Sequence, residues 1–319
     1  MLREKIFPLL RRAVNLYLRL AEEGEDGRIH LAPTYSPETG VYRDANFDLA
    51  LFKWGCHTLL HACKRLDIDD ELIPRWQDVV ERLVEFPTDG ESFMLAGDES
   101  APKYHRHLSH LLMIYPLHLV NIDQPGTESV LHHAHRRVQV AVIGEGNESA
   151  PNQAMIQTHA APIAGALGKG DEALDGLQRQ INELLPNGLW QCAGNPCFES
   201  TISLMSIVQD MLIQSWSDPA SDEPGPIRIF PATPTTWRDV TFHNLRAAGA
   251  FLVSAERAGG RTQWVRIESL AGEPCRVRLD AAEQPEVRGE RDHPITPIQP
   301  GVYDIDLREG ETIELIFQD

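Results

Sequence analysis

The stretch LREKIFPLLRRAVNLYLRLA (residues 2–21) decides the fold of the first part of the chain. Its apolar residues at positions 6, 9, 10, 13, 16 and 20 follow the spacing of an amphipathic helix, which we expect to end at the EGEDG turn (residues 23–27). About eight helices joined by short connections are typical of paired antiparallel helices, so the sequence predicts a mainly α fold. The seven further helical segments are 44–66, 70–84, 107–120, 127–140, 152–167, 171–184 and 199–216.

The composition changes after Trp216. Residues 217–226 form a polar linker rich in Pro and Gly, and the remainder alternates between apolar and polar residues as strands do. Gly259 and Gly260 mark a hairpin turn between two of these strands. We therefore expect a helical domain of catalytic type over residues 1–218 and a small antiparallel, β-sandwich-like domain over residues 219–319. The main strands are expected at 227–230, 250–256, 262–269, 275–279, 302–307 and 312–317.

The chain is acidic, with 47 Asp and Glu against 29 Lys and Arg and a net charge of −18. Such a field repels nucleic acids and anionic membranes, whereas it is compatible with a neutral ligand such as a sugar. The longest apolar run is far shorter than the ~18 residues of a membrane span, and the charged N-terminus does not resemble a signal peptide. The five cysteines are odd in number and show neither disulfide nor zinc spacing, so they leave the compartment undecided.

The most unusual segment is HRHLSH (residues 105–110), at the junction of a loop and an expected helix. His105, Arg106, His107 and His110 together supply several hydrogen-bond donors for sugar hydroxyls. On a helix, His107 and His110 would share a face. Two alternatives stay open: a helix N-terminus with satisfied histidines, and a zinc site, for which no further ligand is evident.

A second segment, GLWQCAGNPCFES (residues 188–200), precedes a long apolar helix. Trp190 offers an apolar face on which a pyranose ring can stack. Glu199 lies where the loop enters the helix, so its carboxylate suits either a helix-capping group stabilised by the helix dipole or a general base directed into a pocket. Spacing alone does not decide between these roles.

Two irregular stretches, residues 28–42 and 87–105, interrupt the helices, and loops of this length often cover a functional site. Glycosidases need two carboxyl groups, ~5 Å apart for retention of configuration and ~6.5–9.5 Å apart for inversion. Asn152, at the start of its helix, is either an N-cap or a ligand contact. Five acids in or just after these stretches are candidates for such carboxyl groups, although each could equally be a solvated surface residue. They are Glu38, Asp44, Asp48, Asp98 and Glu99.

The string HRHLSHLLMIYP (residues 105–116) resembles the HRHxSHLxxxYP motif of glycoside hydrolase family 95, the α-L-fucosidase and α-L-galactosidase type. Residues 36–38 (SPE) resemble that family's Ser-Pro-Glu segment, and residues 195–199 (NPCFE) are similar to its His-Pro-Pro-Phe-Gln stretch. Residues 211–215 and 230–232 also follow the family in order. The resemblance implies an (α/α)₆ barrel with a C-terminal β-domain that hydrolyses a terminal sugar with inversion, without a metal or organic cofactor.

The chain departs from the family's pattern at three places. The family's general base is an Asp three residues after the Phe of the last motif, where this chain has Thr201. The family's acid lies before the HRH motif, yet residues 93–95 contain no carboxyl group, and the asparagine-bearing segment of the early barrel is absent. Because about eight helices do not close a barrel of six helix pairs, we expect a partial (α/α)₆ toroid and, as a partner, a missing N-terminal segment that completes it.

The residues therefore suggest a glycosidase that uses relocated carboxyl groups. Glu199 is the expected base, and Asp98 or Glu99 the expected acid. The alternatives are a catalytically inactive carbohydrate-binding fragment and an (α/α) polysaccharide lyase or epimerase. The family's members are mostly exported, which suggests an extracellular or periplasmic site for the full-length protein. The residues expected to bind substrate are His105, Arg106, His107, His110, Trp190, Asn195, Glu38 and Asn152.

Overall fold

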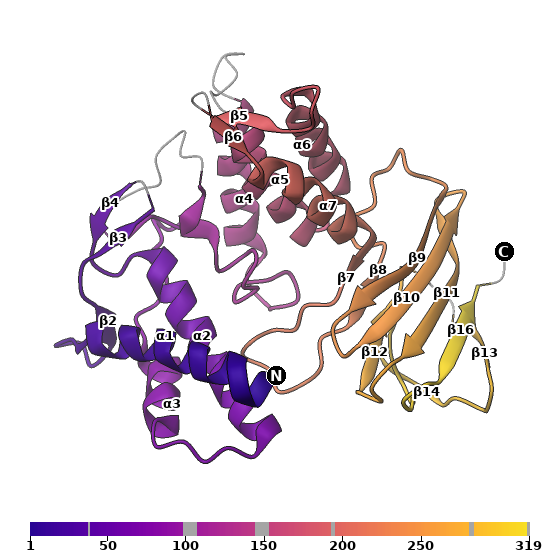
Figure 1. Cartoon of the computed structure of the whole chain (residues 1–319), viewed down its shortest axis with the longest axis horizontal. Helices are drawn as coiled ribbons and strands as arrows, with labels where there is room; N and C mark the ends of the chain where they lie inside the picture. Colours follow the sequence, from indigo (N-terminus) through magenta and orange to yellow (C-terminus); the bar gives the residue numbers. More distant parts are fainter. Residues whose placement is uncertain (38, 98–106, 144–152, 193–194, 281–283, 318–319) are drawn as a thin grey trace. The chain divides into compact units, whose positions relative to one another are not determined.

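The computed structural model describes residues 1–37, 39–97, 107–143, 153–192, 195–280 and 284–317 (Figure 1). The chain divides into two units. The first consists of Met1–Asn152 with Asp218–Asp222, and the second of Gln153–Ser217 with Glu223–Asp319. The domain boundary expected at residue 218 stays a prediction.

Four α-helices form the body of the first unit: α1 (Phe7–Leu20), α2 (Asn46–Leu66), α3 (Ile73–Arg82) and α4 (Glu128–Ile143). The short π-helix η1 (Leu2–Ile6) precedes α1. Helix α1 packs closely on α2, because Gly55 has no side chain at the point where a Cβ atom would lie 2.6 Å from Val14 Cγ2. The core between α1, α2 and α3 contains Phe7, Val14, Leu18, Leu49, Phe52, Leu59, Trp76 and Val79.

Short strands occupy much of the stretch that the sequence suggested to be irregular. Strand β1 (Ala21–Glu23) pairs antiparallel with β2 (Ile29–Leu31), and β3 (Thr34–Ser36) pairs antiparallel with β4 (Gly40–Tyr42). Three-residue strands are too short to show an alternating pattern in the sequence. The first loop is therefore a pair of small hairpins.

The helix expected over residues 107–120 is wrong. This stretch contains the 3₁₀ turn η2 (Ser109–Leu111) followed by further turns. Leu108 and His118 both have left-handed backbone conformations, with φ of 45° and 50°. Together with Pro116, these residues interrupt the hydrogen-bond ladder that a helix needs. Most of the apolar residues of the stretch are buried although no α-helix forms there.

In the second unit, α5 (Gln153–Ala166), α6 (Gly170–Asn182) and α7 (Glu199–Leu212) pack together. Helices α5 and α6 approach closely, since a Cβ atom on Gly176 would lie 2.8 Å from the Ala161 Cβ atom. The hairpin of β5 (Trp190–Cys192) and β6 (Asn195–Cys197) connects α6 to α7. Small residues at the contact between α5 and α6 thus set the spacing of this three-helix group.

Two five-stranded sheets complete the second unit (Figure 1). The first has the order β13-β16-β11-β10-β9 and the second the order β14-β15-β12-β8-β7. Their inner faces share one core that includes Phe251, Val265 and Ile313 from the first sheet and Val277 and Ile305 from the second. The strands are β7 (Ile213–Gln214), β8 (Ile227–Ile229), β9 (Val240–Ala247), β10 (Phe251–Ala258), β11 (Arg261–Ser269), β12 (Cys275–Arg278), β13 (Glu286–Gly289), β14 (Ile295–Gln299), β15 (Val302–Ile305) and β16 (Thr312–Ile316).

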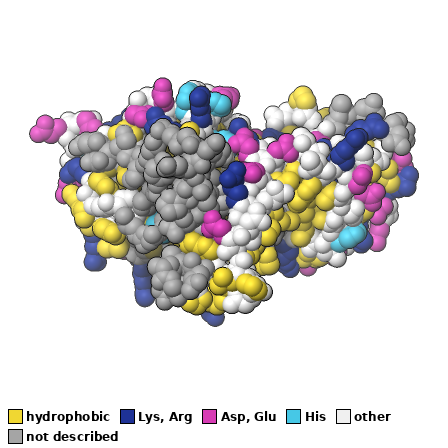
Figure 2. Space-filling view, turned by 90° about the horizontal axis from the view of Figure 1, so that it is seen from above, with side chains coloured by type: hydrophobic (Ala, Val, Ile, Leu, Met, Phe, Trp, Pro, Cys, Tyr) yellow, Lys and Arg dark blue, Asp and Glu magenta, His cyan; other side chains and the backbone are white. Residues whose placement is uncertain are grey.

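The described residues thus form seven α-helices followed by two β-sheets, which confirms the helical first part and the β-rich C-terminal part. The Gly259-Gly260 hairpin is also confirmed, because Ala258 pairs with Arg261 across it. Closure into a toroid stays a prediction. Within the described part of the chain, no helix combines the length and apolar character needed to cross a membrane. On the face shown in Figure 2, acidic, basic and apolar side chains are interspersed.

Candidate active site

Two sequence segments that carry the predicted motifs meet in the first unit. Ser36, at the end of β3, and Ser109, at the start of η2, lie with their Oγ atoms 3.4 Å apart. Both are almost completely buried, with exposed fractions of 1% and 3%. Strand β3 and η2 also both contact α2. Tertiary structure therefore joins the Ser-Pro-Glu segment to the His-Leu-Ser-His segment.

The backbone of the histidine-rich segment reverses at Leu108, whose φ and ψ are 45° and 31°. A left-handed conformation is unfavourable for a residue with a branched side chain and is tolerated where the surrounding structure holds it. Leu108 is buried, as is His110, while His107 is half-buried. His107 and His110 do not share a helix face as expected, since η2 begins only at Ser109.

The first turn of α2 contains Asp48, a buried carboxylate that the sequence showed but did not rank. The hydroxyl of Tyr17 donates to Asp48 Oδ1 at 2.9 Å, and the hydroxyl of Thr34 donates to Oδ2. Burial and the nearby carboxylate both raise the pKa of Tyr17. An acid in the first turn also interacts favourably with the helix dipole. Asp48 therefore fixes α1, α2 and β3, the strand that ends at Ser36, to one another.

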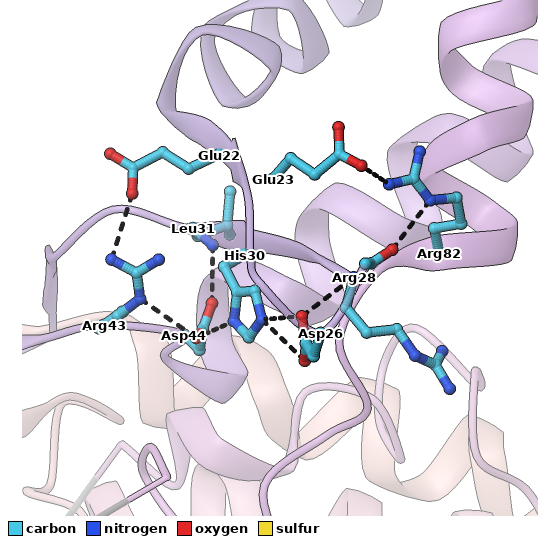
Figure 3. Close-up of polar contacts among 10 residues, drawn as sticks. Glu22, Glu23, Asp26, Arg28, His30, Leu31, Arg43, Asp44 and Arg82 are labelled. Atoms are coloured by element: carbon cyan, nitrogen blue, oxygen red, sulfur yellow. Dashed lines mark hydrogen bonds and ion pairs between the residues drawn. The ribbon is translucent and has the colours of Figure 1, made fainter.

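A second polar network holds the other end of the first loop (Figure 3). Asp44 Oδ2 lies 2.7 Å from His30 Nδ1, and Asp44 Oδ1 accepts a hydrogen bond from the Leu31 amide at 2.7 Å. His30 Nε2 lies 3.2 Å from Asp26 Oδ1. The hydrogen bond to Asp44 is the main reason that the pKa of His30 is raised, followed by the contact with Asp26. This carboxylate–imidazole–carboxylate chain fastens β2 to the residues that precede α2.

Asn46, the first residue of α2, organises the second long loop. Its Nδ2 donates to the carbonyl oxygens of Pro87 and Met94 at 3.0 and 2.7 Å. Its backbone amide donates to Leu95 O at 2.9 Å, and its exposed fraction is 0%. Both long loops and η2 therefore meet α2, the loops at its N-terminal end. The only sequence signal for this anchor is an asparagine at a helix start.

The second unit contains the other predicted residues. Glu199 is exposed and begins α7, as expected for a residue between loop and helix. Trp190 has an exposed fraction of 4%, so protein covers its ring in this structure, and it lies opposite Cys197 in the β5–β6 hairpin. Asn195 lies opposite Cys192 in the same hairpin. Thr201, at the position of the family's base, donates its hydroxyl to Gly188 O at 2.6 Å.

A buried polar cluster supports the start of α7. The side-chain Nε2 of Gln180 donates to the Ser200 carbonyl oxygen and, at 2.6 Å, to Ser203 Oγ. Thr158 Oγ1 donates to Ser200 Oγ at 3.2 Å. Gln180 and Ser200 both have an exposed fraction of 0%. The backbone position of Glu199 is therefore held by three helices.

Several predicted residues lie outside the described part of the chain. In the ranges that are described, no group of three or more His, Cys, Asp or Glu residues is placed to hold a metal ion. The described residues therefore give no support to the zinc alternative. The predicted residues that are not described are Glu38, Asp98, Glu99, His105, Arg106 and Asn152.

Comparison with known proteins gives a consistent result along the chain. The model of the glycosyl hydrolase family 95 catalytic domain matches residues 1–199, and that of the glycoside hydrolase family 95 C-terminal domain matches residues 222–315. No curated protein matches the chain.

Two solved structures share the fold at 10% sequence identity. One is described as a "putative kojibiose phosphorylase from human microbiome" (TM-score 0.53), and the match covers 100% of this chain and 46% of that one. The other is an α-L-rhamnosidase from Dictyoglumus thermophilum (TM-score 0.52), with 98% and 37% covered. The chain thus spans less than half the length of either protein.

Proposed function

The chain belongs to glycoside hydrolase family 95, and from this we propose that it takes part in the inverting hydrolysis of a terminal sugar of the α-L-fucoside or α-L-galactoside type. The observation that carries the proposal is the contact between Ser36 and Ser109. It brings together two motif segments that are far apart in the sequence. A sugar-binding loop cluster at the N-terminal end of α2 is consistent with this arrangement.

The proposed roles follow the chemistry of inversion. One carboxylic acid protonates the leaving oxygen while a carboxylate on the opposite face of the sugar activates a water molecule. We assign the second role to Glu199 and the first to Asp98 or Glu99. His105, Arg106 and His107 are proposed to donate hydrogen bonds to sugar hydroxyls. No metal or organic cofactor enters these steps.

The surface of α1 supports the proposal that a further helix completes the helical domain. Leu9 and Leu16 of α1, and Ile6 at the end of the preceding η1, have exposed fractions of 65%, 58% and 46%, and Ala13 is also exposed. These positions alternate in steps of three and four, which is the spacing of a coiled-coil seam. A helix that is apolar on two opposite faces is normally buried on both.

The charges beside this seam indicate which side chains the proposed covering helix would carry. Arg12 and Arg19 are exposed, lie seven residues apart and have no hydrogen-bond or ion-pair partner among the described residues. In an antiparallel pair of two α1 helices these arginines would face each other and repel. We therefore propose that the covering helix carries acidic residues beside its apolar seam and lies outside these 319 residues.

The test is a hydrolysis screen with aryl α-L-fucoside, α-L-galactoside and α-L-rhamnoside and with pectin oligosaccharides. Glu199→Gln is expected to lower turnover by about 10²–10⁴-fold, the usual contribution of a general base. The matched control is Glu128→Gln, because Glu128 is also an exposed acid in the first position of a helix, α4. Equal turnover of the wild-type chain and Glu199→Gln would refute the assignment of the base.

One observation favours a second candidate, a carbohydrate-binding protein without turnover. The residue at the family's base position, Thr201, has no carboxyl group and its hydroxyl is bound to Gly188 O. Sugar binding without hydrolysis, both by this chain and by a chain extended upstream, would establish this candidate. Hydrolysis by the extended chain alone would instead establish the need for a further segment. The family match gives no support to a lyase or an epimerase.

A further inference from the structure

The outer face of the first sheet in the second unit has an unusual composition. Along β11, Val265 and Ile267 point into the core, so Trp264 and Arg266 lie on the opposite face. A hollow of about 560 Å³ opens on this face, within the ~300–1,000 Å³ typical of ligand sites. Five of its lining residues come from four adjacent strands: His243, Glu256, Trp264, Arg266 and Glu314. We propose that this hollow binds a neutral oligosaccharide and is a carbohydrate-binding site separate from the motif segments.

Trp264 is held in place as a platform. Its indole Nε1 donates to Glu256 Oε2 at 3.1 Å, and these two residues are direct partners in the register of β10 and β11. Ile316 is its partner on the other side, and the His243 ring lies with its centroid 6.3 Å away. Trp264 is nevertheless only partly buried. A ring fixed in this way can contact the C–H groups of a sugar at a low cost in side-chain entropy.

Arg266 supplies donors that no described residue of the protein uses. It lies between Ser254 and Glu314 in the register of the sheet. It is exposed, and among the described residues it forms no hydrogen bond or ion pair, not even with Glu314 directly opposite. A guanidinium and a carboxylate on neighbouring strands can therefore each hydrogen-bond to hydroxyl groups of the same ligand.

A strand irregularity forms the floor of the hollow. The pairing of β9 with β10 shifts register opposite Ser254, because Val253 pairs with Leu245 but Ala255 pairs with Phe242. His243 and Asn244 of β9 therefore face the single residue Ser254 of β10, and β9 carries the extra residue of a bulge. Ser254 Oγ accepts a hydrogen bond from the Asn244 amide at 3.0 Å, and Asn244 has a left-handed φ of 53°. Bulges bend a strand and redirect its side chains, and they occur frequently beside binding sites.

The lining chemistry selects a neutral ligand. The charged side chains that line it are two carboxylates, Glu256 and Glu314, and one guanidinium, Arg266. The whole chain has a net charge of −18, so phosphates, nucleic acids and uronate polymers are disfavoured. Planar carboxylate, guanidinium and imidazole groups around one indole ring suit the vicinal hydroxyls and the apolar ring face of a sugar. A neutral sugar chain meets both requirements.

The test is native electrophoresis of the full chain in gels that contain soluble xyloglucan, galactomannan, arabinan or, as the anionic comparison, polygalacturonate. We expect at least one neutral polysaccharide to retard the wild-type chain and Trp264→Ala to weaken this binding by about tenfold or more, as loss of a buried aromatic contact does. Trp264→Phe, which keeps a ring but loses the bond to Glu256, is expected to fall between. Glu268→Ala is the matched control, because Glu268 is on the same strand and face but outside the hollow.

The proposal is overturned if no neutral polysaccharide retards the chain, if Trp264→Ala is retarded as strongly as the wild type, or if only polygalacturonate retards it. Circular dichroism of both Trp264 variants separates loss of binding from loss of fold. Turnover of an aryl glycoside, where the wild type shows it, is expected to be unchanged in Trp264→Ala. A chain that binds but does not hydrolyse would leave this site intact and refute only the proposed activity.

Discussion

Replacing Asn46 by Ala is the substitution that best tests how the loop cluster is held. The change removes two hydrogen bonds from Asn46 Nδ2, to Met94 O and Pro87 O. The Pro87 oxygen keeps a second donor, the Met94 amide at 3.0 Å, whereas Met94 O has no other donor among the described residues. One buried acceptor without a partner costs about 1–3 kcal/mol and one further lost bond about 0.5–1.5 kcal/mol. We expect a loss of about 2–3 kcal/mol.

Hydrogen exchange measures this loss locally. If the loop opens without global unfolding, the amide exchange of residues 87–97 should rise about 30- to 150-fold, since ~1.4 kcal/mol corresponds to a factor of ten. Asn182→Ala is the control, because Asn182 is exposed at the end of α6 and its loss should change little. Unchanged exchange of residues 87–97 in Asn46→Ala would refute the anchoring argument. An equal rise in β11 would show global destabilisation instead.

Three further predictions concern other parts of the chain. The pKa of His30 is raised in the folded state, so the stability that its charged form contributes is complete below the unfolded pKa of about 6.5 and disappears as the pH rises through the higher folded value. Urea unfolding should therefore show a larger loss of stability for His30→Gln at pH 5.5 than at pH 9. An equal loss at both pH values would contradict this linkage. Gly170→Ala should destabilise by about 1–3 kcal/mol because its Cβ atom would lie 2.2 Å from the Ala232 carbonyl oxygen. Gly97→Ala should not destabilise, because a Cβ atom there would meet no atom of a described residue within 4 Å. Leu9→Gln should change the free energy of unfolding by less than about 0.5 kcal/mol while lowering the binding of a hydrophobic dye; a large loss of stability would show that the exposed face of α1 is already packed.

The contacts that form the candidate site also explain its position in the fold. Ser36 and Ser109 are separated by 73 residues, and Asn46 and Met94 by 48. Ser36 and Ser109 belong to elements that contact α2, and Asn46 is the first residue of that helix, whose buried Asp48 is stabilised by two hydroxyl donors. A single helix terminus therefore positions both long loops, and a defect there is expected to disturb both.

Much of the architecture was predictable from the sequence by itself. Periodicity located α1, α2, α3, α4, α5, α6 and α7, and alternation with the Gly259-Gly260 turn located the β10–β11 hairpin. These signals are local, because burial of one face of a helix or strand leaves its period in the sequence. The motif at residues 105–116 likewise predicted the family that the comparisons confirm.

Only the tertiary structure decided how the predicted residues are arranged. The apolar run at residues 107–120 is compatible with a helix until the left-handed Leu108 and His118 are known, and this backbone depends on packing. Periodicity distinguishes a residue that faces the core from one that faces solvent, but it does not identify the distant partner. Folding alone brings together the segments that form the contacts of Ser36, Asp48 and Asn46 and that cover the ring of Trp190. The physical reason is that side-chain hydrogen bonds between distant residues leave no period in the sequence.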